Sequence, residues 1–343
     1  MKITKLGSVR VDLLGGTLDL NPINLILENV VTLNVATSLK AKVELEKTEK
    51  EGIEIVSLDY KSSHYFSKKD FTPEKLRGSY FGAMAFVCQI LDEFELRSHL
   101  KVTLQSGSPA GAGLGGSSAM GVTLYGAICD YLEKPCEIEN AIKVVNSIEA
   151  RILDSGPAGY QDYYPAMYGG VLALHPIASG VNVEQLFSPE LKSCLESQVT
   201  LVYSGQTRLS GINNWEVYKK FFDKVPSTRE GLKTIADLSF RAYESIMAQD
   251  WDELIKLIGL EGAARRELFP GILSSAMASV HTSIINELPH VGIKVCGAGG
   301  GGCFLFTHKE GEREFIEKKV VEAGMTTLPF EVEHPLFRGE VVS

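Results

Sequence analysis

Residues 105–121 read QSGSPAGAGLGGSSAMG, and this glycine-rich stretch constrains the fold more than any other part of the chain. It follows an alternating segment, LKVTLQS, that predicts a strand, and it precedes a segment whose apolar spacing predicts a helix over 117–132. Glycines let a ligand approach the backbone closely, and the free amides and dipole of a helix N-terminus favour an anion. The stretch is therefore predicted to bind phosphate groups.

Three known motifs were compared with this loop. A Walker A loop requires lysine before the first serine, but that position is Gly116, and a nucleophile elbow requires glycine where Met120 stands. The pattern G-x-G-x-x-G fits Gly111, Gly113 and Gly116, with Glu133 further along the chain. That pattern also recurs near the C-terminus, and no βαβ unit precedes the first copy. A dinucleotide-binding fold is therefore disfavoured.

Composition narrows the classes of partner. The chain has 343 residues and a net charge of −9, which argues against nucleic-acid binding and against a polybasic membrane surface. No run of about 18 apolar residues indicates a membrane span, and the N-terminus lacks the apolar core of a signal peptide. The six cysteines show no C-x-x-C or zinc-ligand spacing. We expect a cytoplasmic protein with small-molecule ligands and without a nucleic-acid or membrane partner.

The order of predicted elements indicates an α+β protein with mixed, largely antiparallel sheets and helices packed on them. Residues 39–46 alternate apolar and charged side chains, and 52–58 is predicted to be their antiparallel partner. The less periodic segment after residue 175 suggests a boundary between an N-terminal domain, 1–185, and a C-terminal domain, 186–343.

Three stretches resemble, in order, the motifs of the GHMP kinases, the superfamily of galactokinase, homoserine kinase, mevalonate kinase and phosphomevalonate kinase. The first is GSVRVDLLGGTLDL at 7–20, which is similar to a strand and turn that end in an aspartate. The second is the loop SPAGAGLGGSSAMG, and the third is KVCGAGGGGCFLF at 294–306, a glycine hairpin between two strands. The resemblance implies the two-domain GHMP-kinase fold and dependence on ATP and Mg²⁺.

A fourth stretch, IEARILDSGPAGYQDYYPAMYGGVLAL at 148–174, resembles the sugar-phosphorylating branch. That branch includes D-glycero-D-manno-heptose 7-phosphate kinases, fucokinases and glucuronokinases, which carry a Gly-x-Gln-Asp segment followed by a Gly-Gly strand. The matching residues here are Gly159, Gln161, Asp162, Gly169 and Gly170.

The resemblance assigns roles to particular residues. The ATP phosphates are expected to contact Pro109, Gly111, Gly113, Leu114, Gly115, Gly116, Ser117 and Ser118. Magnesium is expected to bind Ser118 and Glu149, because Mg²⁺ takes one or two protein oxygens together with phosphate oxygens and water. Without the resemblance, either serine could simply cap the helix, and Glu149 could be a solvated helix acid.

Asp162 is expected to act as the catalytic base or orienting group, with Arg10 as the cation that offsets developing charge. In isolation, an aspartate beside two tyrosines is more typical of a turn. The residues expected to contact the substrate are Asp19, Gly16, Tyr160, Gln161, Gly299, Gly300 and Arg208.

These observations predict an ATP-dependent kinase for a sugar hydroxyl of the heptose, heptose phosphate, fucose or uronic-acid type, with the anomeric hydroxyl as one candidate. Related heptose-phosphate kinases commonly have lysine where this chain has Tyr160, so we predict that an unphosphorylated sugar is preferred. A kinase for a non-sugar alcohol such as mevalonate or homoserine is one alternative. A catalytically inactive nucleotide- or sugar-binding regulator is the other.

Overall fold

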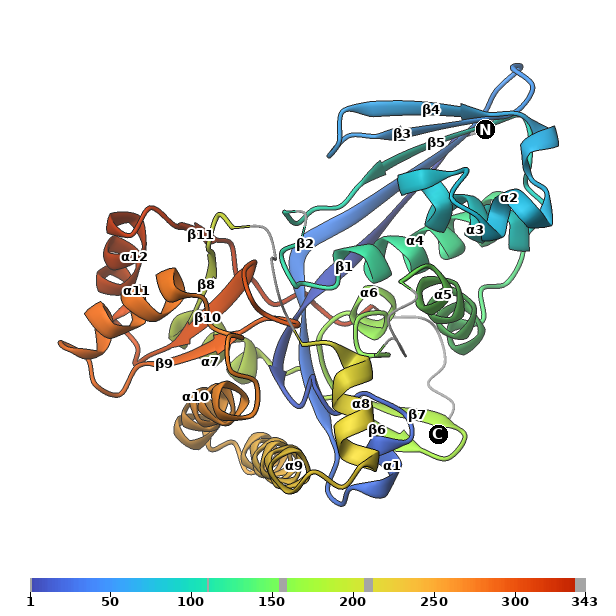
Figure 1. The fold of residues 1–343 in the computed structure, drawn as a ribbon. Coiled ribbons are helices and arrows are strands. Elements are labelled where there is room, and N and C mark those ends of the chain that lie inside the picture. The colour runs from blue at the N-terminus through green and yellow to red at the C-terminus, as the bar shows by residue number, and fades with distance from the viewer. Residues whose placement is uncertain (1, 110, 154–158, 207–211, 337–343) are drawn as a thin grey trace.

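The computed structural model describes residues 2–109, 111–153, 159–206 and 212–336 (Figure 1). These residues form two sheets with helices packed on them, so the α+β class predicted from the sequence is confirmed. One sheet has seven strands from the first half of the chain, and the other has four strands from the second half. The site described below lies where the two halves meet.

The seven-stranded sheet has the order β4-β3-β5-β2-β6-β7, with β1 paired to β2. Its strands are β1 (Lys2–Leu14), β2 (Thr32–Lys47), β3 (Ile53–Ser57), β4 (Ser62–Phe66), β5 (Leu100–Gln105), β6 (Val171–Ile177) and β7 (Gly180–Gln185). The short helix α1 (Ile23–Ile26) lies in the connection between β1 and β2.

Strand β2 organises this sheet because it is long enough to pair with three neighbours. β1 runs antiparallel to it, while β5 pairs with 42–47 and β6 pairs with 32–35. The predicted pairing of 52–58 with 39–46 is wrong, because β5 lies between them and pairs parallel with β3. The antiparallel partner of β3 is β4, a strand that was not predicted from the sequence.

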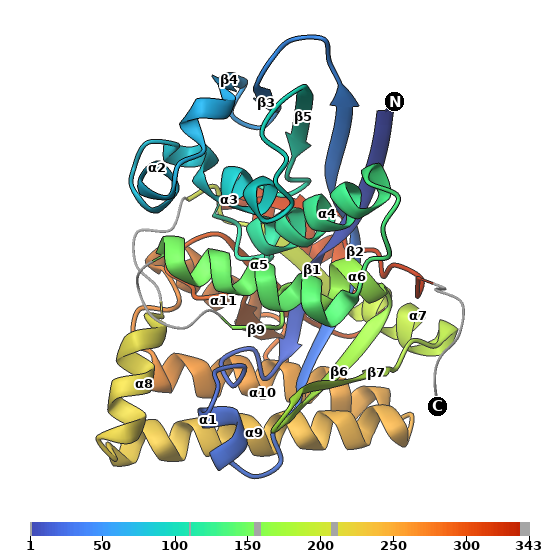
Figure 2. The same ribbon diagram turned by 90° about the vertical axis from the view of Figure 1, so that its right-hand side faces the viewer.

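Helices cover one face of the seven-stranded sheet. They are α2 (Pro73–Arg77), α3 (Ala85–Glu93), α4 (Gly116–Tyr131), α5 (Ile138–Leu153) and α6 (Tyr164–Tyr168), with 3₁₀ turns at Lys68–Asp70 and Gly82–Met84. Figure 2 shows α4 between the sheet and α5, and α4 contacts β1, β2, α3 and α5. Because neighbours surround α4, its side chains are buried around most of its circumference, and its position fixes the glycine loop that precedes it.

The second sheet has the order β11-β8-β10-β9, all antiparallel. Its strands are β8 (Val199–Tyr203), β9 (Gly292–Val295), β10 (Cys303–Thr307) and β11 (Thr326–Leu328). The helices of this half are α7 (Pro189–Gln198), α8 (Asn214–Phe222), α9 (Pro226–Met247), α10 (Trp251–Leu268), α11 (Ser275–Ile285) and α12 (Arg313–Glu322). Helices α9 and α10 lie side by side, and α10 packs on β9 and β10 (Figure 1).

The largest hydrophobic core includes residues from both halves of the chain, from Val9 on β1 to Leu305 on β10. Two smaller cores lie around the four-stranded sheet and between α8, α9 and the β1–α1 connection. The predicted division at 185/186 falls between β7 and α7, and it stays a prediction. No helix within the described part of the chain is long and apolar enough to span a membrane.

Candidate active site

Two adjoining cavities mark the candidate site. The polar cavity, of about 490 Å³, lies between the end of β1, the segment 159–163, the start of α8 and the third glycine motif. The loop cavity, of about 360 Å³, lies along the glycine loop and the apolar side chains of α3. Both cavities are lined by Gly113, Gly115, Ser118, Glu149 and Asp162. The five shared residues are therefore placed where two ligands could meet.

The loop cavity contains every residue that was predicted to hold phosphate. Its lining includes Pro109, Gly111, Gly113, Leu114, Gly115, Gly116, Ser117 and Ser118. Gly115 is the N-cap of α4 and has φ +68°, a conformation that a side chain disfavours. The free amides of the first turn of α4 thus begin at the junction of the two cavities, which suits an anion.

At Gly113, the glycine loop packs directly against the third glycine motif. Its φ is +77°, and a Cβ there would lie 2.6 Å from the carbonyl oxygen of Cys296. In addition, the amide of Cys303 donates to the carbonyl of Ala112 at 2.7 Å. The glycine hairpin between β9 and β10 therefore lies directly against the loop. A side chain at Gly113 would disturb this packing as well as the approach of a phosphate.

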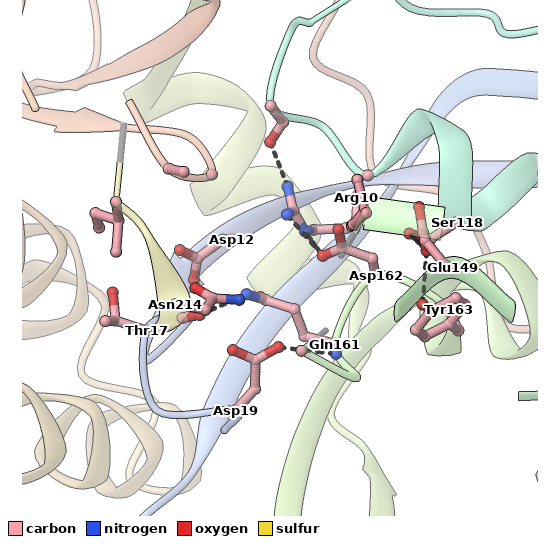
Figure 3. Close-up of a pocket in the computed structure, with 18 of the residues that line it drawn as sticks. Arg10, Asp12, Thr17, Asp19, Ser118, Glu149, Gln161, Asp162, Tyr163 and Asn214 are labelled. Atoms are coloured by element: carbon pink, nitrogen blue, oxygen red, sulfur yellow. Dashed lines mark hydrogen bonds and ion pairs between the residues drawn. The ribbon is translucent and has the colours of Figure 1, made fainter. Parts of the chain in front are cut away.

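Arg10 and Asp162 form an ion pair at the junction (Figure 3). Nε and Nη2 of Arg10 lie 2.8 and 2.7 Å from Oδ1 of Asp162, and Nη1 donates to the carbonyl of Gly113 at 2.6 Å. Burial opposes the charge on Arg10, but Asp162 and Asp12 raise the pKa of its guanidinium above the usual value. Both contacts to Asp162 use Oδ1, so Oδ2 receives none from Arg10.

Ser118 and Glu149 meet on the other side of the junction, as Figure 3 shows. Oγ of Ser118 donates to Oε2 of Glu149 at 2.7 Å, and the hydroxyl of Tyr163 donates to the same oxygen at 2.6 Å. Burial raises the pKa of Glu149. Mg²⁺ takes one or two protein oxygens together with phosphate oxygens and water. The side-chain oxygens of Ser118 and Glu149 fit this requirement, because they lie beside the helix amides that suit a phosphate. Among the described residues, no cluster of three or more His, Cys, Asp or Glu could hold a metal by itself.

Asp19 and Gln161 lie together in the polar cavity. The amide of Gln161 donates to Oδ2 of Asp19 at 3.2 Å, and its side-chain Nε2 donates to the carbonyl of Gly16 at 2.8 Å. Gly159 faces Asp19 so closely that a Cβ would lie 2.0 Å from Oδ2. Burial, followed by the charge of Asp162, raises the pKa of Asp19 to about 7.

The raised pKa of Asp19 predicts a pH-dependent stability. Folded Asp19 holds its proton up to about pH 7, whereas an unfolded aspartate loses it near pH 3.9, so its ionisation costs stability as pH rises between these values. We expect Asp19→Asn, which cannot ionise, to gain about 2–3 kcal/mol over wild type between pH 5 and pH 8. Urea denaturation of both proteins at the two pH values measures this, and a constant difference would contradict it.

A buried charged cluster lies behind the polar cavity and was not anticipated. Nζ of Lys294 lies 2.6 Å from Oε2 of Glu261 and 3.1 Å from Oδ2 of Asp12, and Nη1 of Arg265 lies 3.8 Å from the same Asp12 oxygen. All four side chains are at most 3% exposed. The sequence did contain a signal for Asp12, because it lies two residues after Arg10 on one strand and the two side chains therefore share a face. The others come from distant elements and carried no local signal.

Three residues predicted to contact the substrate do not line either cavity. Tyr160 packs against Tyr164 and its hydroxyl accepts from Nδ2 of Asn24 at 3.5 Å. Gly299 and Gly300 lie against Ile272, while their neighbours Gly297 and Ala298 line the polar cavity. Arg208 lies outside the described residues.

Known proteins share sequence and fold with this chain. Residues 80–170 match the sequence profile of the GHMP kinases N-terminal domain. The chain is 24% identical to the bifunctional fucokinase/GDP-fucose pyrophosphorylase of Arabidopsis thaliana over 89% of its length, and spans 30% of that protein. It is 24% identical to the D-glycero-alpha-D-manno-heptose 7-phosphate kinase of Campylobacter jejuni, with 87% of both chains covered. A mevalonate kinase of Saccharolobus solfataricus is 24% identical, over 65% of this chain and 66% of that one.

Solved structures show the same fold. The galactokinase of Lactococcus lactis, complexed with galactose, aligns with a TM-score of 0.76 at 11% identity, covering 98% of this chain and 95% of that one. A D-glycero-D-manno-heptose 1-phosphate kinase from Bacteroides thetaiotaomicron aligns with a TM-score of 0.73 at 19% identity, covering 98% and 97%. The fold is thus that of the GHMP kinases, and residues 80–170 match their N-terminal domain. The predicted resemblance to this superfamily is confirmed, with relatives that include both sugar kinases and mevalonate kinases.

Proposed function

We propose that this protein is an ATP-dependent kinase that transfers the γ-phosphate to a hydroxyl of a sugar. One observation carries the proposal: Asp162, held by Arg10, lies at the junction of a cavity lined by the glycine loop and a second, polar cavity. Phosphoryl transfer needs two substrates positioned end to end and charge stabilisation between them, with little covalent work from the protein. The two adjoining cavities offer the two substrate positions, and Arg10 offers the positive charge between them.

The residues at the junction divide the chemistry among themselves. The amides at the start of α4 bind the phosphates. The oxygen of the sugar hydroxyl forms the bond to the γ-phosphorus, and Asp162 accepts the proton that this hydroxyl loses. The bond between that phosphorus and the bridging oxygen of ADP breaks. Arg10 offsets the negative charge that develops beside Asp162. Ser118 and Glu149 would hold Mg²⁺, which would neutralise part of the phosphate charge.

The Glu149 assignment makes a testable prediction. Glu149→Gln keeps the shape of the side chain and can still pair with Ser118 and Tyr163, but it removes the charge that attracts a cation. We expect the Mg²⁺ concentration needed for half-maximal rate to rise about tenfold, the equivalent of about 1.4 kcal/mol. Glu139→Gln, on the same helix but outside both cavities, is the matched control. An unchanged Mg²⁺ dependence in Glu149→Gln would return this residue to a structural role.

The lining of the polar cavity supports a neutral acceptor. Its described residues include four acidic side chains, those of Asp12, Asp19, Glu149 and Asp162, and only two cationic groups. Arg10 and Arg265 are both engaged by carboxylates and backbone carbonyls. At an effective dielectric constant of 20, one cation 4 Å away stabilises a phosphate by about 4 kcal/mol. An acceptor that already carries a phosphate would lose this stabilisation where no cation is free to pair with it. The charge of the cavity therefore supports a neutral acceptor independently of Tyr160, which does not line it.

ADP release over a panel of acceptors tests the proposal. The panel contains L-fucose, D-galactose, D-mannose, D-glycero-D-manno-heptose, the 7-phosphate of that heptose, mevalonate and homoserine. We expect a neutral sugar to be phosphorylated with a kcat/KM at least tenfold higher than that of the phosphate ester. If the ester is the better substrate and Arg208→Ala abolishes its advantage, the neutral-sugar assignment is wrong.

A mevalonate-type kinase is the second candidate, because mevalonate kinases are among the relatives. Mevalonate carries a carboxylate, which the acidic lining of the polar cavity disfavours. If mevalonate is phosphorylated and no sugar is, the sugar assignment is overturned. ATP binding without turnover on any acceptor would instead indicate a nucleotide-binding regulator.

A further inference from the structure

Buried polar atoms without hydrogen-bond partners gather at the polar cavity. Among the described residues there are seven such side-chain atoms, and four belong to residues that line this cavity: Asp12 Oδ1, Thr17 Oγ1, Gln161 Oε1 and Arg265 Nε. Unpaired polar atoms are rare in protein interiors, and each one calls for an explanation. A ligand that supplies the missing partners accounts for their concentration in one place.

Asp12 and Arg265 are held so that one atom of each remains free. Oδ2 of Asp12 takes the contacts from Lys294 and Arg265, which leaves Oδ1. Nη1 and Nη2 of Arg265 donate to the carbonyls of Val295 and Gly297 at 2.8 and 2.7 Å, which leaves Nε. A cluster that served stability alone would have no reason to leave a hydrogen-bond acceptor and a donor unpaired in two residues that line the cavity.

The charge of Asp12 favours a ligand that donates a hydrogen bond to it. Burial opposes its ionisation, but Lys294, Arg265 and Arg10 together lower the pKa of its carboxyl below the usual value. Ionised Asp12 can only accept a hydrogen bond, and Nε of Arg265 can only donate one. A hydroxyl group does both, whereas a carboxylate or phosphate oxygen would face Asp12 with a lone pair.

We propose that Asp12 and Arg265 determine acceptor specificity by binding a hydroxyl that is not the one phosphorylated, with Asp12 Oδ1 accepting its proton and Arg265 Nε donating to its oxygen. This inference rests on the proposed function and extends it to two residues outside the phosphate loop and the Gly-x-Gln-Asp segment. It requires the acceptor to be a polyol with a hydroxyl at a fixed distance from the reacting one. A monodeoxy analogue that lacks this hydroxyl leaves both atoms unpaired.

The test compares the best sugar of the panel with each of its monodeoxy analogues, by kcat/KM, in wild type and Asp12→Asn. A site built to bind a hydroxyl rejects the analogue that lacks it. The analogue that lacks the phosphorylated hydroxyl does not react. Among the others, we expect wild type to discriminate against one by about 10- to 100-fold, the effect of leaving a buried donor and acceptor unpaired. Asp12→Asn should reduce that discrimination to below threefold and leave the ranking of the other analogues unchanged.

Glu261→Gln is the matched control, because it also neutralises a carboxylate on Lys294 but does not line the cavity. It should keep the wild-type discrimination. If Glu261→Gln loses discrimination as Asp12→Asn does, or if Asp12→Asn keeps it for every analogue, the subsite is overturned. Purely structural roles, or ordered water at these atoms, would give those results.

A second measurement covers the case in which Asp12→Asn does not fold. In wild type, a monofluoro analogue at the identified position can accept from Arg265 but cannot donate to Asp12, so it should be at least as poor as the deoxy analogue. A fluoro analogue as good as the parent sugar overturns the subsite alone, because turnover of the parent shows that the sugar kinase assignment stands. If no sugar is phosphorylated, the proposed function and the subsite both fall.

Discussion

Asp162→Asn is expected to lower kcat by roughly 10²–10⁴-fold while ATP affinity stays near that of wild type. The substitution keeps the shape of the side chain and leaves an oxygen that can accept hydrogen bonds from Arg10. The contact with Arg10 is therefore kept, while the negative charge is lost. The substitution also removes the group that takes the proton of the acceptor hydroxyl. Because ATP phosphates are proposed to bind backbone amides of the loop, the loss should fall on turnover.

Steady-state kinetics with the best acceptor, together with calorimetric titration of an ATP analogue, separate these effects. Asp92→Asn is the matched control, since Asp92 pairs with Arg97 on the surface of α3 and lines neither cavity. It should behave as wild type. Retention of more than a tenth of wild-type kcat in Asp162→Asn would rule out the proton-accepting role. Equal losses of kcat and ATP affinity would indicate that Asp162 only supports the loop through Arg10 and Gly113.

The local features of the fold could be predicted because their signals are local. The glycine loop ends at the N-terminus of α4, as the strand, glycines and helix spacing predicted. The strand GSVRVDLL, which the family resemblance implied, is the buried part of β1. Ser118 and Glu149 lie 31 residues apart in the chain, and only the family resemblance indicated that they would meet.

The remaining features depend on contacts between distant segments. The pairing of β2 with β5 rather than β3 requires a strand that arrives about fifty residues later, and alternation alone cannot reveal which edges join. The orientation of Tyr160 follows from its packing beside Tyr164, which a comparison of motifs does not contain. The cluster around Lys294 draws on β1, α10 and β9, so its members had no common sequence signature.

That cluster gives the largest stability prediction. Lys294 is fully buried between the carboxylates of Asp12 and Glu261, and Lys294→Met preserves most of its volume while removing the positive charge. The remaining partners are Arg265, 3.8 Å from Asp12, and the amide of Gly15, 3.4 Å from Glu261. Removing one member of a buried ion pair costs about 3–5 kcal/mol, because the other charge is left uncompensated. We expect a loss of that size in the free energy of unfolding.

The loss should depend on pH in a defined direction. In Lys294→Met, Asp12 loses the nearest of the cations that lower its pKa, while burial still raises it, so in the folded variant this residue keeps its proton to a higher pH than in the unfolded chain. The stability of the variant therefore rises as pH falls from 8 to 5. In wild type, Lys294 and Arg265 lower the pKa of Asp12, so this gain is absent for that residue. The difference between the two proteins should narrow toward pH 5.

A double variant separates charge from packing. Adding Glu261→Gln to Lys294→Met removes one of the two uncompensated buried charges and should recover a substantial part of the loss, although each change alone destabilises the protein. Urea denaturation of wild type, both single variants and the double variant at pH 5 and pH 8 completes the cycle. If the single losses simply add, or if Lys294→Met matches wild type at pH 8, the lysine does not neutralise the two carboxylates. In that case Asp12 would not be held ionised toward the polar cavity.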